Sequence, residues 1–139
     1  IAGPQVQRGK SRRPVGLIDI YPTLLEMTGQ KSNPKHEGQS LVPLLRDPAR
    51  AWRRPALTTF GRGNHAVRST RWRYIRYRDG SEELYDHEQD PHEWTNLAGD
   101  KKYRQVMAAH RRWLPQNEQP ILGKGSTGHK AYAAAQPQP

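Results

Sequence analysis

The chain has 139 residues, enough for one ordinary domain or parts of two but not for a large enzyme. Its 23 Lys and Arg exceed its 13 Asp and Glu, giving a net charge of +10, and only 33% of residues are hydrophobic, which predicts a modest core. No apolar run approaches the roughly 18 residues of a membrane span. Without cysteine, the chain has no disulfide, thiolate metal ligand or cysteine nucleophile. Because it begins with Ile, we expect a longer parent protein.

The first fifty residues predict two helices. Residues 1–4 are typical of the end of a buried strand. A helix over 19–28 is indicated by Asp19 as its cap, a proline in the first turn and a glycine after the last. Ser40 can cap a second, short helix over 40–46.

Beyond residue 55 the apolar residues alternate, which predicts an antiparallel sheet of about four strands. The expected strands cover residues 56–60, 65–69, 72–78 and 82–86. Asp79-Gly80 between the last two strands predicts a type I′ hairpin turn, because glycine tolerates the positive φ that this turn requires.

A final helix is predicted over 100–114, capped by Asp100. Its expected apolar stripe consists of Tyr103, Val106, Met107, His110, Trp113 and Leu114. Glu93, in the preceding turn, is expected to reach back to backbone donors. The sequence thus divides into 1–50, 51–115 and a disordered tail over 116–139.

The charges are unevenly distributed along the chain. Residues 50–78 contain nine arginines and no acid, whereas residues 79–93 contain seven acids and no Lys or Arg. Since a turn joins these segments, we expect most charges to pair across strands, with Glu82 and Glu83 near Arg76 and Arg78. A free anion-binding face is the alternative.

Familiar catalytic patterns are absent: the sequence has no Gly-rich phosphate loop, HExxH, GxSxG or CxxC. The six histidines are scattered. His87 and His92 lie near acids in a turn, where solvated turn residues are favoured over a metal site.

Three segments, in this order, resemble formylglycine-dependent sulfatases. Residues 15–29 (VGLIDIYPTLLEMTG) resemble the helix after the catalytic core, and residues 38–45 (GQSLVPLL) resemble the next segment. Residues 83–98 carry ELYD, DP, E and NLA, which are similar to the signature of the C-terminal subdomain. The resemblance covers residues 1–114 and is closest to bacterial iduronate-sulfatase-like members.

The resemblance implies an α+β fold: the end of an alkaline-phosphatase-like α/β domain, then a small antiparallel sheet packed on a C-terminal helix. It implies a parent enzyme, periplasmic or secreted, that hydrolyses sulfate esters of carbohydrates with a formylglycine and a calcium ion. The implied partners are the rest of the catalytic domain and a sulfated small molecule or glycan. Nucleic acid and a membrane span are not implied.

The catalytic motifs of that family cannot be transferred to this chain. The formylglycine motif reads Cys/Ser-x-Pro/Ala-x-Arg, whereas Ser32-Asn33-Pro34-Lys35-His36 ends in His and follows the first helix. The metal ligands should lie upstream of Ile1. We therefore assign no catalytic residue, metal ligand or cofactor here and expect the isolated chain to be inactive.

The C-terminal portion of such an enzyme can contribute one wall of the substrate cleft. Arg62, Asn64, His65 and Arg68 combine two cations, an amide and an imidazole in a loop entering the sheet, and such sets bind anionic sugars. The alternative is that these residues only tie the sheet to the neighbouring domain.

Two other functions remain open. Residues 73–78 interleave arginines and aromatics as single-strand binders do, which would suit a basic polyanion- or nucleic-acid-binding module. The acidic return strand argues against this reading, because it would mask the arginines. An inactive structural remnant is the other possibility.

Overall fold

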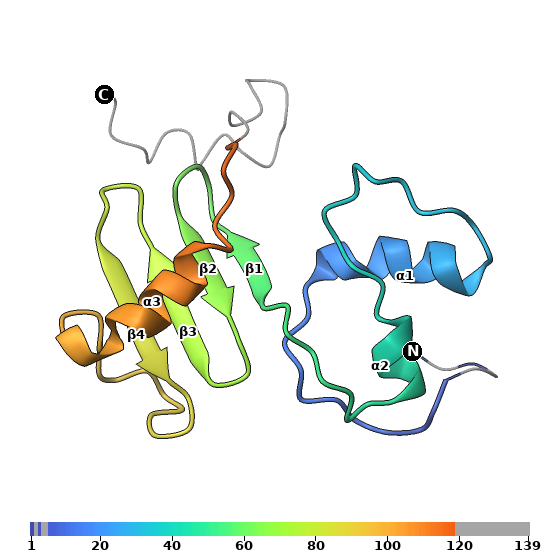
Figure 1. The fold of residues 1–139 in the computed structure, drawn as a ribbon, viewed down its shortest axis with the longest axis horizontal. Helices are drawn as coiled ribbons and strands as arrows, with labels where there is room; N and C mark the ends of the chain where they lie inside the picture. Colours follow the sequence, from blue (N-terminus) through green and yellow to red (C-terminus); the bar gives the residue numbers. More distant parts are fainter. Residues whose placement is uncertain (2, 4–5, 119–139) are drawn as a thin grey trace.

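The computed structural model describes residues 1, 3 and 6–118, which form short N-terminal helices, an antiparallel sheet and a helix across that sheet (Figure 1). The strand end expected at residues 1–4 is not found in the described part. Ile1 is exposed and Gly3 lies in a bend, while residues 2 and 4 lie outside the described residues. Most of the expected tail, residues 119–139, also lies outside them.

Both N-terminal helices are present but shorter than expected. A 3-10 turn, η1 (Leu17–Asp19), leads directly into α1 (Ile20–Met27), and α2 (Val42–Arg46) follows a loop. The N-cap of α2 is Leu41 instead of the expected Ser40; the Ser40 hydroxyl, one residue earlier, still accepts a hydrogen bond from the Val42 N–H at 3.2 Å.

Asp19 does not cap α1 with its side chain, contrary to expectation. Its backbone is already helical (φ −79°, ψ −14°) because η1 precedes it, and its buried carboxylate turns away from the helix. The carboxylate accepts hydrogen bonds from the Gly16 and Gln39 N–H groups, both at 2.9 Å. The buried Thr23 hydroxyl accepts another from the Leu41 N–H at 2.8 Å. These polar contacts hold the 38–41 segment against the start of α1.

The four-stranded antiparallel sheet is confirmed. Its strands follow each other in space in the order of the sequence. They are β1 (Ala56–Thr59), β2 (His65–Arg68), β3 (Trp72–Arg76) and β4 (Glu82–Asp86). The alternating pattern therefore predicted every strand, with ends shifted by at most two residues.

The turn between β3 and β4 is not the expected two-residue type I′ turn. Tyr77 and Ser81 close a three-residue loop through a hydrogen bond from the Tyr77 N–H to the Ser81 carbonyl at 2.9 Å. Only Gly80 in this loop has positive φ (86°). Asp79 keeps a negative φ, and its carboxylate instead accepts the Ser81 N–H at 2.9 Å.

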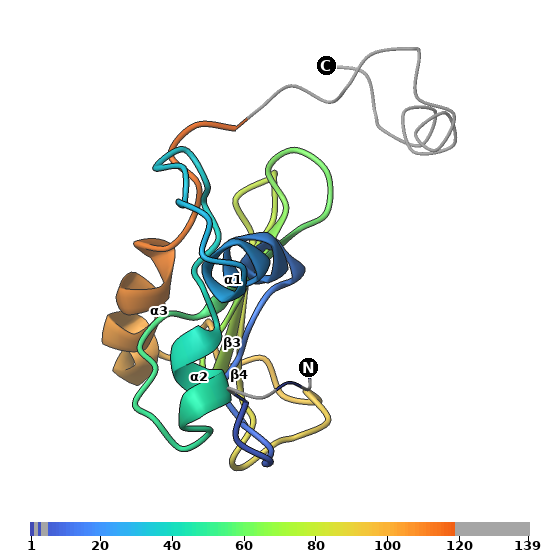
Figure 2. The same cartoon turned by 90° about the vertical axis from the view of Figure 1, so that its right-hand side faces the viewer.

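The predicted C-terminal helix forms as a 3-10 turn, η2 (Lys101–Tyr103), and α3 (Arg104–Arg111). Asp100 caps it as expected, accepting from the Lys102 N–H at 3.0 Å. Helix α3 lies across one face of the sheet (Figures 1 and 2). The buried core between them consists of Val67, Tyr74, Leu84 and Met107. Trp113, expected in this stripe, remains 46% exposed because it follows the end of α3.

The register assigns the polar side chains to two faces of the sheet. Tyr74 pairs with Val67 and Leu84, which all face α3, and side chains alternate along each strand. His65 and Glu82 therefore share the α3 face, whereas Arg68 and Arg73 lie on the opposite face. The loop after β4 covers part of that opposite face (Figure 2). The division of the chain at residue 50 stays a prediction.

Candidate functional site

The loop between β1 and β2 is shaped by two glycines with positive φ, Gly61 (67°) and Gly63 (81°). A hydrogen bond from the Phe60 N–H to the Asn64 carbonyl, at 2.9 Å, closes it. A side chain at Gly63 would place its Cβ 2.9 Å from the Cβ of Arg78, so the loop packs closely on the neighbouring hairpin. Glycine is required here for both conformation and space.

His65, the first residue of β2, is buried with only 5% of its surface exposed. Its Nδ1 lies 2.9 Å from the hydroxyl oxygen of Thr59, its register partner on β1. Its Nε2 lies 3.0 Å from Oε1 of Glu118, which follows α3. Both ring nitrogens are therefore engaged, and the imidazole has a fixed orientation.

The Glu118 carboxylate is held by three different groups of this loop. Besides His65, the Arg62 Nε lies 3.6 Å from Oε2, and the Gly63 backbone N–H also favours the ionised carboxylate. These contacts, the His65 hydrogen bond foremost, lower the pKa of Glu118. The Arg62 side chain remains 57% exposed. The loop thus forms a receptor for a carboxylate, built from a guanidinium, an imidazole and a backbone amide.

Asn64 shapes this loop from within. Its Oδ1 accepts the Arg78 N–H at 3.2 Å, and its Nδ2 donates to the Arg62 carbonyl at 3.4 Å. The amide therefore ties the loop to the β3–β4 hairpin, and its side chain points into these contacts.

Arg68 lies on the opposite face of the sheet, and its guanidinium is engaged within the protein. Its guanidinium donates to the carbonyls of Ser69 at 2.5 Å and Trp72 at 3.2 Å, and it lies 2.9 Å from Nδ1 of His87. Burial lowers the pKa of Arg68. The structure therefore brings Arg62 and His65 together and separates Arg68 from them. Substrate contact by the four predicted residues stays a prediction.

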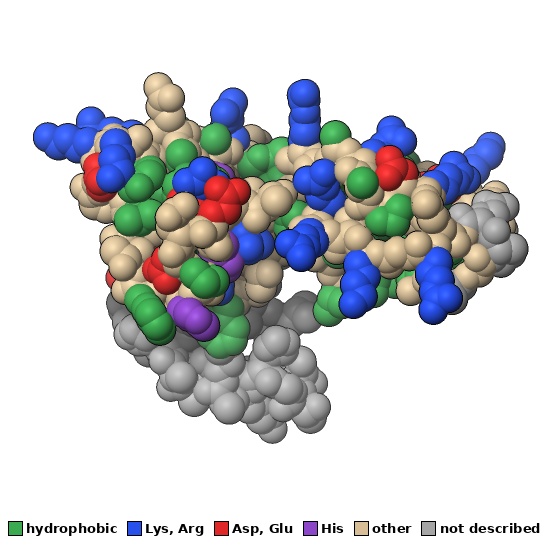
Figure 3. All heavy atoms as spheres, turned by 90° about the horizontal axis from the view of Figure 1, so that it is seen from below, with side chains coloured by type: hydrophobic (Ala, Val, Ile, Leu, Met, Phe, Trp, Pro, Cys, Tyr) green, Lys and Arg blue, Asp and Glu red, His purple; other side chains and the backbone are tan. Residues whose placement is uncertain are grey.

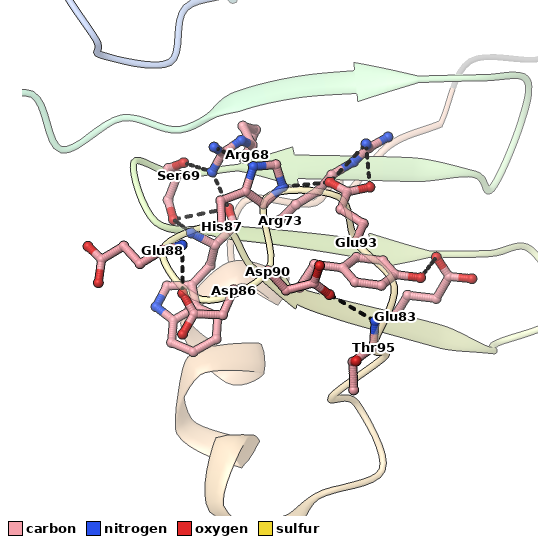
Figure 4. A network of polar contacts seen from close by, with 12 residues as sticks. Arg68, Ser69, Arg73, Glu83, Asp86, His87, Glu88, Asp90, Glu93 and Thr95 are labelled. Atoms are coloured by element: carbon pink, nitrogen blue, oxygen red, sulfur yellow. Dashed lines mark hydrogen bonds and ion pairs between the residues drawn. The ribbon is translucent and has the colours of Figure 1, made fainter.

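A network of charged side chains continues from Arg68 across this face (Figure 4). His87 Nε2 lies 2.5 Å from Glu93 Oε1, and Arg73 donates to Glu93 Oε2 at 2.9 Å. We expected Glu93 to accept hydrogen bonds from backbone donors, but its carboxylate binds these side chains instead. Asp90 accepts the backbone bond, from the Thr95 N–H at 2.8 Å. Among the described non-glycine residues, Glu93 alone has positive φ (59°), which directs its side chain toward the sheet.

Glu82, the first acid of β4, is paired, but not with an arginine that we expected. Glu82 lies opposite Arg76 in the register, yet it binds Arg111 of α3 and the Tyr74 hydroxyl, because helix α3 brings Arg111 over this corner. The bond from Arg111 lowers the pKa of Glu82.

At the other end of β4, Arg71 donates to the buried carboxylate of Asp86 through two nitrogens, at 2.8 and 2.5 Å. Arg73, in the stripe over residues 73–78, is held by Glu93, whereas Arg76 of the same stripe is exposed. The nucleic-acid-binding module therefore stays an untested alternative.

The described residues do not fit a metal centre. Across residues 1, 3 and 6–118, no group of three or more His, Asp or Glu side chains could hold an ion. His87 is engaged with Arg68 and Glu93, and His92 stacks on Trp94 with ring centroids 4.9 Å apart. Within the same ranges, no helix is long and apolar enough to span a membrane.

Residues 4–119 match the family described as "N-sulphoglucosamine sulphohydrolase, C-terminal". A sulfatase of Formosa agariphila is 41% identical over 115 residues, covering 82% of this chain and 23% of the relative. A Delta 4,5-hexuronate-2-O-sulfatase of Bacteroides thetaiotaomicron is 35% identical over 131 residues, covering 81% and 26%. The solved structure of a 2-O GAG sulfatase superposes with a TM-score of 0.64 at 30% identity, covering 80% and 27%.

The chain therefore spans about a quarter of the length of the relatives that it matches. The family match over residues 4–119 includes the whole sheet and the C-terminal helix. The chain belongs to the sulfatases, as a member of the family of their C-terminal portion.

Proposed function

We propose that this chain is the C-terminal portion of an enzyme that hydrolyses sulfate esters of carbohydrates, and that it forms one wall of the substrate cleft. Support comes from the family match over residues 4–119 and from relatives named for sulfated sugars. The reacting groups would lie in the rest of the enzyme, because this chain spans about a quarter of those relatives.

The role that we propose for the β1–β2 loop is recognition of an anionic group on the sugar. The observation that carries this role is the carboxylate of Glu118, which Arg62, His65 and the Gly63 N–H hold together. Because these donors favour the ionised carboxylate, they also suit a sugar carboxylate or sulfate that takes its place. A guanidinium matches both kinds of anion through two parallel hydrogen bonds.

The formylglycine and the calcium ion are proposals for the whole enzyme alone. This chain has no cysteine, and residues 1, 3 and 6–118 contain no cluster that fits a metal ion. We therefore derive no catalytic step through either group. What these residues contribute is the binding and orientation of the sugar.

The remainder of the sulfatase domain is the partner that we propose for η1 and α1. Large apolar side chains stand exposed along both elements: Leu17, Ile18, Ile20, Tyr21, Leu24 and Met27. Leu17 is 87% exposed, and contiguous apolar surface of this kind marks an interaction site. The apolar face of a helix commonly covers a sheet in α/β domains.

Arg62 offers the sharpest test of the loop, because its exposed side chain can be removed without opening the core. In the full-length enzyme, we expect Arg62→Ala to lower kcat/KM on a sulfated disaccharide roughly 10- to 100-fold, as for one lost charge-assisted contact. A small aryl sulfate, which lacks the second anionic group, should be hydrolysed nearly as before. Arg62→Lys should recover only part of the loss, since it keeps the charge without the planar fork.

Arg76→Ala is the matched control, because Arg76 is exposed on the next strand, opposite His65 in the register. It should leave both substrates unaffected. Equal losses on both substrates for Arg62→Ala, with a lowered melting temperature, would assign the loop a purely structural role. His65→Ala is less informative, because it strips Thr59 and Glu118 of a partner and should lower stability in either case.

A further inference from the structure

The positive charge of the protein is concentrated in its N-terminal part. Residues 1–54 contain ten Lys and Arg against four Asp and Glu, whereas residues 55–118 contain eleven against nine. The surplus therefore does not lie mainly in residues 55–118, where Arg71, Arg73 and Arg111 form ion pairs with acids. Figure 3 shows Lys and Arg side chains projecting over the half of the molecule that contains α1 and α2, with few acidic side chains among them.

Two segments of this half are held side by side. The Gln7 N–H donates to the Leu45 carbonyl at 2.8 Å. The Arg13 guanidinium donates to the carbonyls of Arg50 and Ala49, both at 3.0 Å. These bonds join residues 6–13 to the end of α2 and the turn after it.

The two segments also touch at Gly9, where an added Cβ would lie 2.9 Å from Cγ of Pro48. This close contact shows that the two segments pack against each other at this point. We call the surface formed by residues 6–13 and 46–54 the basic face.

Six cations of the basic face are exposed: Arg8, Lys10, Arg12, Arg46, Arg50 and Arg53. In the part of the chain that the structure describes, none of the six forms an ion pair. The one acid in these two segments is Asp47, and its carboxylate accepts the Ala49 N–H at 3.0 Å. The basic face thus presents uncompensated positive charge on a framework fixed by backbone bonds.

We propose that the basic face binds a linear sulfated polysaccharide chain, at a position distinct from the β1–β2 loop. The choice of this polyanion rests on the proposed function. A fixed array of cations attracts such a polymer over several sugar units and raises its local concentration near the enzyme. The loop would then recognise one sugar, while the basic face retains the chain that carries it.

The composition of the face disfavours two other polyanionic partners. None of the exposed large apolar side chains in the described residues lies within 6–13 or 46–54, so the face has nothing to insert into a membrane. Trp52, the one aromatic residue in these segments, is partly buried and offers no open ring for nucleic-acid bases to stack on. The basic face can therefore bind a partner only through charge and hydrogen bonds, which are the contacts that a sulfated glycan makes.

The test compares two variants of the 139-residue chain with equal loss of charge. In the first, the six cations of the basic face are replaced by Gln, with Arg13 kept because it joins the segments. The control replaces six exposed cations elsewhere by Gln: Lys31, Lys35, Arg76, Lys101, Arg104 and Arg112. Binding of heparin is measured by titration calorimetry at several salt concentrations. Circular dichroism melts verify that both variants fold.

We expect the basic-face variant to bind heparin about tenfold or more weakly at 0.15 M salt, with the control close to wild type. By the counterion-release argument for linear polyanions, the slope of log K against log salt should fall by roughly 0.7–0.9 per contact removed. Equal losses in the two variants would overturn the proposal, since net charge alone would explain them. So would equally tight binding of a DNA duplex or of phosphatidylserine vesicles.

The heparin test can fail or succeed independently of the Arg62 test of the proposed function. Arg62→Ala should leave heparin binding by the chain unchanged if the basic face acts independently. A large effect of Arg62→Ala on heparin, with none from the six-fold variant, would move polymer binding to the loop and overturn the proposal. Loss of heparin binding in the six-fold variant supports it even if Arg62 proves irrelevant to hydrolysis.

Discussion

Asp86 is the most deeply buried carboxylate of the sheet, with 3% of its surface exposed. Its oxygens accept two bonds from Arg71 and one from the Glu88 N–H at 3.1 Å. The bond from Arg71 keeps the pKa of Asp86 below its usual value, so the group is ionised and fully partnered. The Arg71 guanidinium and the Glu88 N–H thus both donate to this one carboxylate.

Asp86→Ala should therefore lower the free energy of unfolding by roughly 1–3 kcal/mol, because it leaves the Glu88 N–H without an acceptor and the Arg71 guanidinium with only the exposed Glu88 carboxylate. Glu88→Ala is the control: its carboxylate also contacts Arg71, at 3.2 Å, but is 59% exposed. We expect a loss below about 0.5 kcal/mol there. Urea denaturation measures the free energy of unfolding of both variants. Similar losses in the two would contradict the larger role of Asp86.

His110 makes stability depend on pH. Its Nδ1–H donates to the Val106 carbonyl at 2.7 Å and its Nε2 lies 3.0 Å from the Ser69 hydroxyl oxygen. Burial lowers the pKa of His110 below its ordinary value of 6.5, so the unfolded chain binds a proton at higher pH than the folded one. Stability from this group is complete above pH 6.5 and declines as the pH falls through the folded pKa.

Melting temperatures measured between pH 8 and pH 5 should thus decrease more steeply for the wild type than for His110→Gln, which cannot titrate there. Parallel curves would show that His110 contributes nothing to the pH dependence.

At the scale of the elements, the approach of the 38–41 segment to the start of α1 depends on a residue without a side chain. A Cβ at Gly38 would lie 2.1 Å from the Ile18 carbonyl oxygen and 2.7 Å from its carbon. Both are backbone atoms, so neither can move without a shift of the main chain at Ile18. The loop and η1 must separate if anything larger occupies position 38.

Gly38→Ala should consequently destabilise the protein by about 1–3 kcal/mol and weaken the bonds of Asp19 to this segment. Gly99→Ala provides the comparison, because nothing lies within 4 Å of an added Cβ there and φ is ordinary. It should be neutral or slightly stabilising, since alanine restricts the unfolded chain. Equal melting temperatures for the two variants would mean that the close approach is not maintained in solution.

Local pattern predicted the elements well, because alternation and helical spacing are properties of a few neighbouring residues. The pairing of side chains was less predictable. Glu82 faces Arg76 in the sheet but binds Arg111, and only the docking of α3 brings that arginine near. Likewise, the Asp19 side chain does not cap α1, because η1 precedes it and its backbone is already helical.

The candidate site was predicted in part. Arg62 and His65 follow from the composition of a glycine-bounded loop, but Glu118 does not. It lies in a stretch of Gln, Asn and Pro that reads as the start of a tail, and no pattern marks it. Arg68 was grouped with Arg62 and His65, but alternation along β2 places it on the opposite face from His65, and its contacts with the carbonyls of Ser69 and Trp72 have no sequence signal.

On the scale of the whole molecule, the proposed function assigns sugar recognition to this chain and the reacting groups to the rest of the enzyme. We expect the purified 139-residue chain to release no sulfate from an aryl sulfate, even after treatment with a formylglycine-generating enzyme. It has no cysteine, and Ser32-Asn33-Pro34-Lys35-His36 lacks the arginine of the serine motif. A colorimetric assay of the chain and of a mock purification checks this. Turnover above the mock level would refute it.

The simple order of the strands has a consequence for the kinetics of folding. Each strand pairs with its neighbour in the sequence, so every hairpin closes over a short loop and little chain entropy is lost before contacts form. Helix α3 then supplies Met107 to a sheet whose Val67, Tyr74 and Leu84 are already aligned. The contact between His65 and Glu118 spans 53 residues and must form after both. We therefore expect the carboxylate receptor to be empty in the folding transition state and to close last, when the sheet and α3 are in place.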